Sequence, residues 1–301
     1  MRRLSALISA LISFAAFAQG PKPAAPPAAP NQSAVLVGVV ASTNDEVAKK
    51  QADALARFVG IAVKETTLPR VFPDQESLAN AVSKGEVDVG LMGPLGYVRL
   101  DPRAKTQLMF RTVRQGKSVY RSAIFAPMTS KLSSLEDIRK SKKPLKVAWV
   151  ETSSATGYVI PKALMMQAGI SPPQSFETQD FLGSHDAVCT AVLEGKYDVG
   201  ATFADPVTGQ AKVSGCEKAL GKKAEQLKIV ALSSDVPNDV LVAAPKFSQG
   251  KIDAIIATAK GADKTEDGKG WLKAAFLAEG VADVKDEDFA PIRKALDAFV
   301  P

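Results

Sequence analysis

The sequence of 301 residues is poor in the side chains that bind metals, with one histidine and two cysteines. So few nitrogen and sulfur ligands cannot make a convincing zinc site, and we expect no metal. Lysines and arginines outnumber acidic residues by 38 to 32, but they are spread along the chain and aromatic residues make up only 6%. Without a basic stripe interleaved with aromatics, nucleic acid is a poor candidate partner.

Long apolar runs are also scarce, and the one clear example lies at the N-terminus. Two arginines precede an almost wholly apolar stretch that ends in the small-x-small sequence Ala16-Phe17-Ala18. The pattern predicts a signal peptide over residues 1–18, cleaved before Gln19, with an uncleaved anchor as the alternative. Residues 19–33 are rich in Pro and Ala and predict a stiff linker. No later segment is long enough to span a membrane, so the mature chain should be exported and soluble.

Export bears on the charge and on the cysteines. Cleavage would remove two arginines and no acidic residue, which lowers the formal charge from +6 to +4 (6 − 2). A mildly basic protein is compatible with a small anionic ligand. Cys189 and Cys216 can form a disulfide in an oxidising compartment. Two unpaired thiols, one of them buried, remain the alternative, because spacing alone does not show bond geometry.

A ten-residue pattern occurs twice, as AVSKGEVDVG at residues 81–90 and AVLEGKYDVG at residues 191–200. Each copy predicts a helix that ends at a left-handed glycine, followed by a short strand and a loop. Two copies are too few for a solenoid and suit two similar α/β lobes. Ligands of open α/β sheets bind beyond the carboxyl ends of strands, so the loops at 93–97 and 203–206 should meet at one cleft.

The remaining pattern predicts two doubly wound α/β lobes joined by two crossing segments, near Tyr120 and Asp235. The chain opens as βαβαβ, with a first helix ending at Gly60 and a second strand at 61–67. Lobe 1 should comprise residues 34–120 and 236–301, and lobe 2 residues 121–235. Further strands are expected at 34–40, 87–92, 107–114, 120–127, 145–150, 197–203, 228–232 and 240–244. Helices are expected at 76–83, 135–140, 157–168, 186–193, 252–260, 270–278 and 291–299, and a turn at 233–238.

Two predicted helix starts carry the chemistry of interest. The sequence ETSSATGY at 151–158 follows an apolar strand and opens a helix. Free N–H groups and nearby hydroxyls at a helix N-terminus suit a tetrahedral oxyanion. The alternative is that these residues only cap the helix, because capping residues have the same sequence pattern. His185 opens another helix, where its neutral form can donate one N–H and its protonated form would add charge. A surface or capping role is the alternative for this histidine.

The stretch from Val147 to Asp205 resembles the phosphonate- and phosphite-binding proteins of ABC transporters, which are type II periplasmic binding proteins. The second repeat and the first-lobe sequence Asp88-Val89-Gly90-Leu91, followed by Gly93-Pro94 and Tyr97, add to the resemblance. It covers most of the chain after Ser33. The other residues that carry it are Ser154-Ala155-Thr156-Gly157-Tyr158, Pro161, Phe181 and Gly183-Ser184-His185-Asp186-Ala187.

This resemblance implies a ligand site and a function. The implied ligand-binding residues are Ser154, Ala155, Thr156, Gly157, His185, Tyr97, Asp205 and Gln75. Two of these depart from the family, since Ala155 offers only its N–H and Gln75 stands where a Tyr is common. The implied protein is a periplasmic monomer without cofactor or catalytic activity. It would capture a phosphonate, phosphite or phosphate between its lobes and deliver it to an ABC permease in the inner membrane.

Three other functions remain open from the sequence. The same fold could bind sulfate or a sulfonate, or it could serve a ligand sensor. A hydrolase using Ser154 or Ser184 with His185 is disfavoured. The G-x-S-x-G elbow is missing from the sequence, and Asp186 is too close along the chain to orient His185 as a triad acid does.

Overall fold

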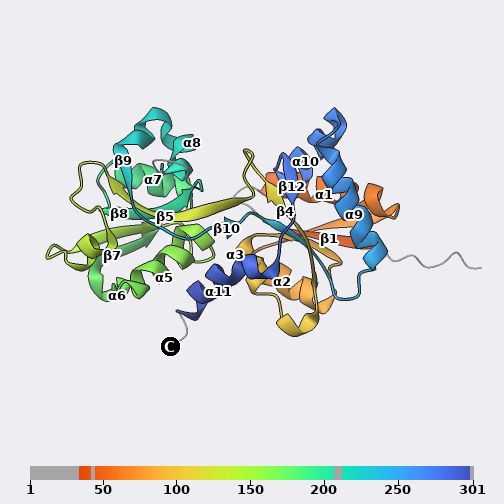
Figure 1. The fold of residues 1–301 in the computed structure, drawn as a ribbon, viewed down its shortest axis with the longest axis horizontal. Coiled ribbons are helices and arrows are strands. Elements are labelled where there is room, and N and C mark those ends of the chain that lie inside the picture. Colours follow the sequence, from red (N-terminus) through yellow and green to blue (C-terminus); the bar gives the residue numbers. More distant parts are fainter. Residues whose placement is uncertain (1–33, 42–44, 207–211, 299–301) are drawn as a thin grey trace, which may run out of the picture. The chain divides into compact units, whose positions relative to one another are not determined.

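The computed structural model describes residues 34–41, 45–206 and 212–298. The predicted signal peptide and linker lie outside the described residues. The described chain forms two six-stranded α/β sheets with helices on both faces (Figure 1). This confirms the two α/β lobes predicted from the repeat. None of the helices in these ranges combines the length and apolarity needed to cross a membrane.

The first sheet has the strand order β12-β4-β11-β3-β1-β2 and opens with the predicted βαβαβ unit. Strand β1 pairs in parallel with both β2 and β3. Strand β11, which follows the second sheet in the chain, inserts antiparallel between β3 and β4. The elements are β1 (Val35–Val40), α1 (Asp45–Val63), β2 (Thr67–Phe72), α2 (Gln75–Lys84), β3 (Val89–Met92), α3 (Pro94–Val98), β4 (Gln107–Val113), β11 (Val240–Ala243) and β12 (Gly280–Ala282).

The predicted end of the first helix at Gly60 and the predicted strand at 61–67 were wrong. Helix α1 continues to Val63, and β2 begins only at Thr67. The apolar run Ile61-Ala62-Val63 suggested a strand, but Val63 packs against the core beneath the helix. Gly60 does not end the helix; it lets α1 approach β2 closely, because a Cβ at this position would lie 2.9 Å from the hydroxyl of Thr67.

The second sheet has the order β10-β5-β8-β6-β7, with β9 also paired to β5. The expected turn at 233–238 was partly wrong, because β10 pairs with the start of β5. Strand β7 was missed; it lies at the sheet edge beside β6 and is largely polar. The strands are β5 (Val119–Pro127), β6 (Leu145–Trp149), β7 (Phe176–Phe181), β8 (Val199–Ala204), β9 (Leu227–Leu232) and β10 (Val236–Pro237). The helices are α4 (Leu135–Arg139), α5 (Ile160–Gln167), α6 (Pro172–Ser175), α7 (His185–Leu193) and α8 (Glu217–Leu220).

The repeated sequence builds the same strand start in each sheet. The carboxylate of Asp88 accepts a hydrogen bond from the N–H of Leu36 at 2.8 Å, and the Asp88 N–H donates to the Leu36 carbonyl at 2.9 Å. Asp198 makes the same two bonds with Lys146, at 2.9 and 3.0 Å. Each aspartate therefore fixes its strand beside the parallel neighbouring strand, β1 in the first sheet and β6 in the second.

The glycines of the repeat also have matching roles. Gly85 and Gly195 both have a φ of 74°, which favours glycine, at the end of the preceding helix. At Gly90 a Cβ would lie 2.8 Å from Val82, and at Gly200 it would lie 2.8 Å from Val192. The missing side chains let each helix pack closely on its strand.

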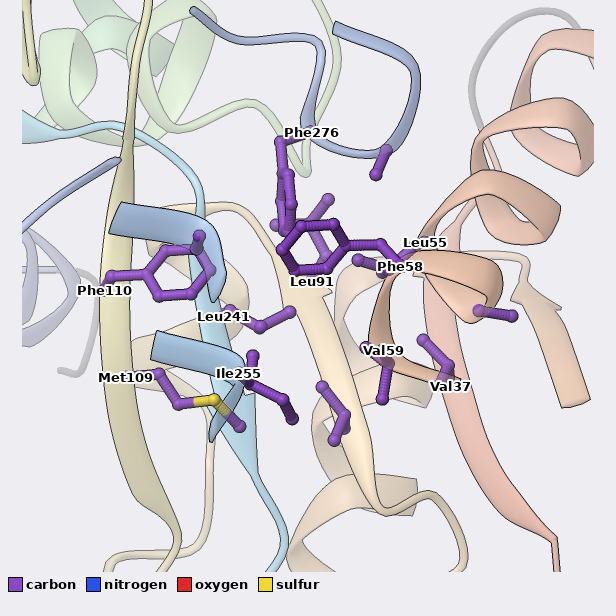
Figure 2. Close-up of a cluster of buried hydrophobic side chains, with 14 of the residues drawn as sticks. Val37, Leu55, Phe58, Val59, Leu91, Met109, Phe110, Leu241, Ile255 and Phe276 are labelled. Atoms are coloured by element: carbon purple, nitrogen blue, oxygen red, sulfur yellow. The ribbon is translucent and has the colours of Figure 1, made fainter. Parts of the chain in front are cut away.

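The last helices follow the return of the chain to the first sheet. Helices α9 (Gln249–Ala262) and α10 (Glu266–Phe276) pack with α1 around an apolar cluster (Figure 2). In this cluster Phe276 meets the rings of Phe58 and Phe110 edge-on, at 5.0 and 5.5 Å. Helix α11 (Ala290–Asp297) differs from the expected return to lobe 1, because it packs against both α3 and α5.

Asn238 ties together the two segments that cross between the sheets. Its side-chain amide donates to the carbonyls of Thr112, at 3.1 Å, and Lys117, at 2.9 Å. Its backbone N–H donates to the carbonyl of Ser118 at 3.1 Å. The segment from β4 to β5 and the segment from β10 to β11 are therefore held side by side.

Candidate ligand-binding site

A cleft with a volume of about 1030 Å³ is lined by helix and loop residues around the first sheet, by residues of the second lobe and by the crossing segments. The segments that follow the two repeats both contribute, as the repeat predicted, through Gly93, Pro94 and Leu95 and through Phe203 and Asp205. The first segment was predicted as a loop and is instead the start of α3. From the second lobe the lining also includes Ser153, Ser154, Ala155, Thr156 and His185. The crossing segments contribute Arg114, Gln115, Lys117, Val119, Tyr120, Asn238 and Asp239.

The turn at residues 154–156 carries several hydrogen-bond donors to the cleft. It leads from β6 into a single π-helical turn, Ala155–Val159, that continues into α5. Such π-turns are rare and occur frequently at functional sites. The hydroxyl of Ser154 accepts from the Gly157 N–H at 3.0 Å, which confirms a capping role and leaves its O–H free to donate. Among the described residues, the N–H groups of Ala155 and Thr156 have no acceptor.

Thr156 and Gly157 have different tasks in this turn. The Thr156 side chain is only 4% exposed, yet it lines the cleft, and no described residue accepts from or donates to its hydroxyl. Its carbonyl accepts from the hydroxyl of Ser122 at 2.8 Å, which fixes the turn to β5. Gly157 does not line the cleft. A Cβ at Gly157 would lie 2.4 Å from Val150, so glycine lets the turn pack on the end of β6.

His185 lies at the start of α7 and faces the same cleft. Its Nδ1 is 2.9 Å from the hydroxyl of Thr202, and its ring meets Phe203 edge-on at 5.2 Å. Burial lowers the pKa of His185 to about 4, against a small opposing effect of Asp186. The imidazole is therefore neutral near pH 7. In the tautomer in which the Thr202 hydroxyl donates to Nδ1, the proton resides on Nε2, which can then donate to a ligand.

Gln75 and Asp205 line the cleft, whereas Tyr97 does not. The Gln75 side chain accepts from the N–H of Gly93 at 3.1 Å, which ties α2 to the loop after the first repeat. The Tyr97 hydroxyl donates to Asp286 at 2.8 Å, and its ring packs on Phe289 at 4.2 Å. Burial and the hydrogen bond to Asp286 raise the pKa of Tyr97. The structure thus places Tyr97 against the C-terminal segment instead of among the cleft residues.

Sequence reasoning missed the charged residues that the crossing segments bring to the cleft. Arg114 pairs with Asp239 at 2.5 Å and also donates to the carbonyl of Leu277 at 3.0 Å. The carboxylate of Asp239 raises the pKa of Arg114. Lys117 pairs with Asp205 at 2.5 Å. These partners are far apart in sequence, and the one available signal was their position at the predicted crossings.

The structure also shows the state of the two cysteines. The structure joins Cys189 of α7 to Cys216 by a disulfide, in place of two unpaired thiols. Over the described ranges, no three side chains of His, Cys, Asp or Glu form a group that could hold a metal ion.

Solved structures of similar fold cover nearly the whole described chain. XAC2383 from Xanthomonas citri, bound to chloride ion, is 17% identical with a TM-score of 0.71, over 88% of this chain and 99% of that chain. A binding protein component of an ABC phosphonate transporter from Pseudomonas aeruginosa, PA3383, is 21% identical, with a TM-score of 0.65 and coverage of 88% and 86%. PhnD1 from Prochlorococcus marinus, in complex with methylphosphonate, is 17% identical, with a TM-score of 0.67 and coverage of 88% and 98%.

The two sheets, the two crossings and the cleft between them define a type II periplasmic binding protein. A family model described as "ABC transporter, phosphonate, periplasmic substrate-binding protein" matches residues 37–289. The chain belongs to this phosphonate-binding family of ABC transporter substrate-binding proteins. Members of the family are binding components of transporters and not enzymes, so the hydrolase alternative falls away.

Proposed function

We propose that the cleft captures a small phosphorus oxyanion, a phosphonate, phosphite or phosphate, for delivery to an ABC permease in the inner membrane. The observation that carries this proposal is the turn at residues 154–156. Its N–H groups and the hydroxyl of Thr156, which have no hydrogen-bond partner in the described part of the chain, line the same cleft as the neutral imidazole of His185.

The chemistry of these donors suits a tetrahedral anion. A buried anion must exchange its water for hydrogen bonds, because burial of an unpaired charge is very unfavourable. Hydroxyl and N–H groups at a helix start supply such bonds together with a partial positive charge. The cleft volume of about 1030 Å³ far exceeds one oxyanion. We therefore propose that the lobes close around the ligand, as is common in binding proteins.

The proposal includes how the chain is organised and where it works. Residues 1–18 act as a signal peptide and residues 19–33 as a linker, and the mature protein is a periplasmic monomer. Lobe 1 comprises residues 34–120 and 236–301, and lobe 2 residues 121–235. Sulfate or a sulfonate is the alternative ligand, because Ala155 removes one hydroxyl from the turn that resembles the phosphonate family. Delivery to a receptor for sensing, instead of to a permease, is the alternative task.

A thermal-shift screen followed by calorimetry tests the ligand. The screen compares phosphate, phosphite, methylphosphonate, 2-aminoethylphosphonate, sulfate and taurine at equal concentrations. A ligand that binds only the folded protein stabilises it by about 2.7 kcal/mol at 100 times the dissociation constant, and so raises the midpoint of unfolding. We expect the largest shifts from phosphorus oxyanions. Stronger binding of sulfate or taurine would replace the proposed ligand class with the sulfur one.

A further inference from the structure

The acidic side chains that line the cleft are already engaged within the protein. Lys117 Nζ lies 2.5 Å from Asp205, and Arg114 lies 2.5 Å from Asp239. Glu279 accepts a hydrogen bond from the backbone N–H of Gly116 at 3.2 Å. These three are the carboxylates of the described cleft lining. A ligand cation would therefore meet no carboxylate that lacks a partner.

The backbone of Lys117 is held firmly in the first crossing segment. Arg114 and Lys117 exchange two backbone hydrogen bonds of 2.9 Å, and the Lys117 carbonyl also accepts from the Asn238 side chain at 2.9 Å. From this fixed turn the side chain extends to Asp205 at the end of β8. The side chains of the pair are 38% and 42% exposed, so the pair borders the open cleft.

Phe203 lies between His185 and Asp205 in the chain's contacts along the cleft, because its ring meets His185 and it stands two residues before Asp205. Phe203 contacts His185 edge-on at 5.2 Å and Tyr120 edge-on at 6.5 Å. Phe203 and Asp205 are two residues apart at the strand end, and both line the cleft. A tail that extends from an oxyanion at His185 along the Phe203 ring would reach the Lys117–Asp205 pair.

A positively charged tail is disfavoured at this place. An ammonium group that approaches Asp205 must displace Lys117 and is repelled by it, and this repulsion strengthens as the cleft loses water. An alkyl tail meets the apolar ring of Phe203 without this penalty. The same pair would instead attract an ammonium if Lys117 were absent.

We propose that Lys117 determines specificity: by pairing with Asp205 it makes the cleft select phosphonates with an uncharged tail over aminoalkylphosphonates. The inference rests on the proposed function, because it presupposes an oxyanion at His185 and at the turn of residues 154–156.

The matched ligands ethylphosphonate and 2-aminoethylphosphonate, which differ by one ammonium group, test the inference by calorimetry on the full protein. We expect the wild type to favour ethylphosphonate. In Lys117→Met, 2-aminoethylphosphonate should bind about fivefold tighter or more, and ethylphosphonate should change by less than about twofold. Adding Asp205→Asn to Lys117→Met should abolish the gain. Lys117→Gln gives a second neutral variant with the same expectation.

Arg121→Met is the matched control, because Arg121 pairs with Asp235 at 2.6 Å and neither residue lines the cleft. It should leave the ratio of the two affinities unchanged. If the ratio of the two affinities is unchanged in both Lys117 variants, this inference is overturned and the proposed function stands. Equal weakening of both ligands also overturns it, because Lys117 would then hold the oxyanion itself. If the wild type binds neither phosphonate nor any other phosphorus oxyanion, the proposed function fails and this inference fails with it.

Discussion

At the scale of single residues, Thr156 and His185 show how burial prepares donors for a ligand. Thr156 is 4% exposed and has a hydroxyl without a partner among the described residues. His185 is kept neutral by burial, with its ring oriented by Thr202 and Phe203. The imidazole of His185 is largely desolvated on folding and its ring is already positioned, so little further reorganisation is needed there when an anion binds.

Thr156→Val keeps the shape of the side chain and removes its hydroxyl. A hydrogen bond to a charged group contributes about 1.5–3 kcal/mol, so the affinity for the best phosphorus oxyanion should fall about tenfold to a hundredfold. Calorimetry measures the change. Thr258→Val is the matched control, because its hydroxyl donates within α9 to the Ala254 carbonyl at 2.7 Å and is absent from the cleft lining. Equal affinities of wild type and Thr156→Val would remove Thr156 from the site.

The stability of the protein should depend on pH through His185. Its pKa is about 4 in the folded protein, against the ordinary value of 6.5 that applies to the unfolded chain. Between these values the unfolded chain binds the proton and the folded protein does not. The stability present above pH 6.5 is therefore lost as pH falls toward 4, by about 3 kcal/mol in full. Denaturant unfolding from pH 7 to pH 4 measures the loss.

His185→Gln retains a donor but cannot titrate, so this part of the pH dependence should vanish in the variant. Other groups titrate equally in both proteins and cancel in the comparison. Ligand affinity between pH 6 and 8 should have the same slope in both proteins, set by the ligand's own ionisation near pH 6. A steeper slope in the wild type would show that a protonated imidazole binds the anion.

At the scale of elements, the repeated sequence is a device for starting a parallel strand. Gly90 and Gly200 permit close packing on the preceding helix, and the aspartate of each copy holds the neighbouring strand. The repeat thus explains why two similar lobes form. Ligand choice depends instead on residues outside the repeat, such as Thr156 and Lys117.

Gly200→Ala should destabilise the protein by about 1–3 kcal/mol through overpacking. The new Cβ would lie 2.8 Å from both Val188 and Val192, whose side chains are fully buried. Adding Val192→Ala should relieve part of this overlap, although it also removes buried methyl groups. Gly270→Ala, in α10 with nothing within 4 Å, should raise stability by up to about 1 kcal/mol. Denaturant unfolding measures the free energy of unfolding of each variant and so checks their order of stability. A Gly200→Ala protein as stable as wild type would contradict the packing argument.

The sequence predicted the strand–helix order well wherever apolar periodicity was strong. It failed at Ile61-Ala62-Val63, where packing extended α1 through residues with strand propensity. It missed β7, since that edge strand has few buried residues to mark it. In the site, the turn at 154–156 and His185 could be predicted, because each lies at a helix start that contiguous residues of the sequence mark. The pairs of Lys117 and Arg114 were not, because their partners are brought near only by the fold.

At the scale of the whole molecule, covalent and polar links limit how the chain can move. The disulfide between Cys189 and Cys216 closes a loop with a sequence separation of 27 residues and fixes α7, which carries His185. Asn238 joins the two crossing segments. Any closure of the lobes must therefore bend both crossing segments together while α7 stays attached to its own sheet.

Removing the disulfide by Cys189→Ala with Cys216→Ala should lower stability by about 3–4 kcal/mol, the loss of loop-closure constraint for a loop of this length. For a protein of this size the midpoint of thermal unfolding should fall by roughly 10 °C. A reductant should lower the midpoint of the wild type and leave that of the double variant unchanged. Two thiols that react with an alkylating agent in the native, unreduced protein would contradict the bridge.

Trp149 gives the site an intrinsic spectroscopic reporter. It is fully buried one residue before Val150, whose N–H donates to the Gly157 carbonyl, and its ring meets Tyr158 of the π-turn edge-on at 5.5 Å. The only other tryptophan, Trp271, is 41% exposed on α10. Replacing Trp271 with Phe would leave a single tryptophan, beneath the residues proposed to hold the anion, that can be excited selectively. Its emission can then follow capture and release in real time, without a dye and without altering the cleft.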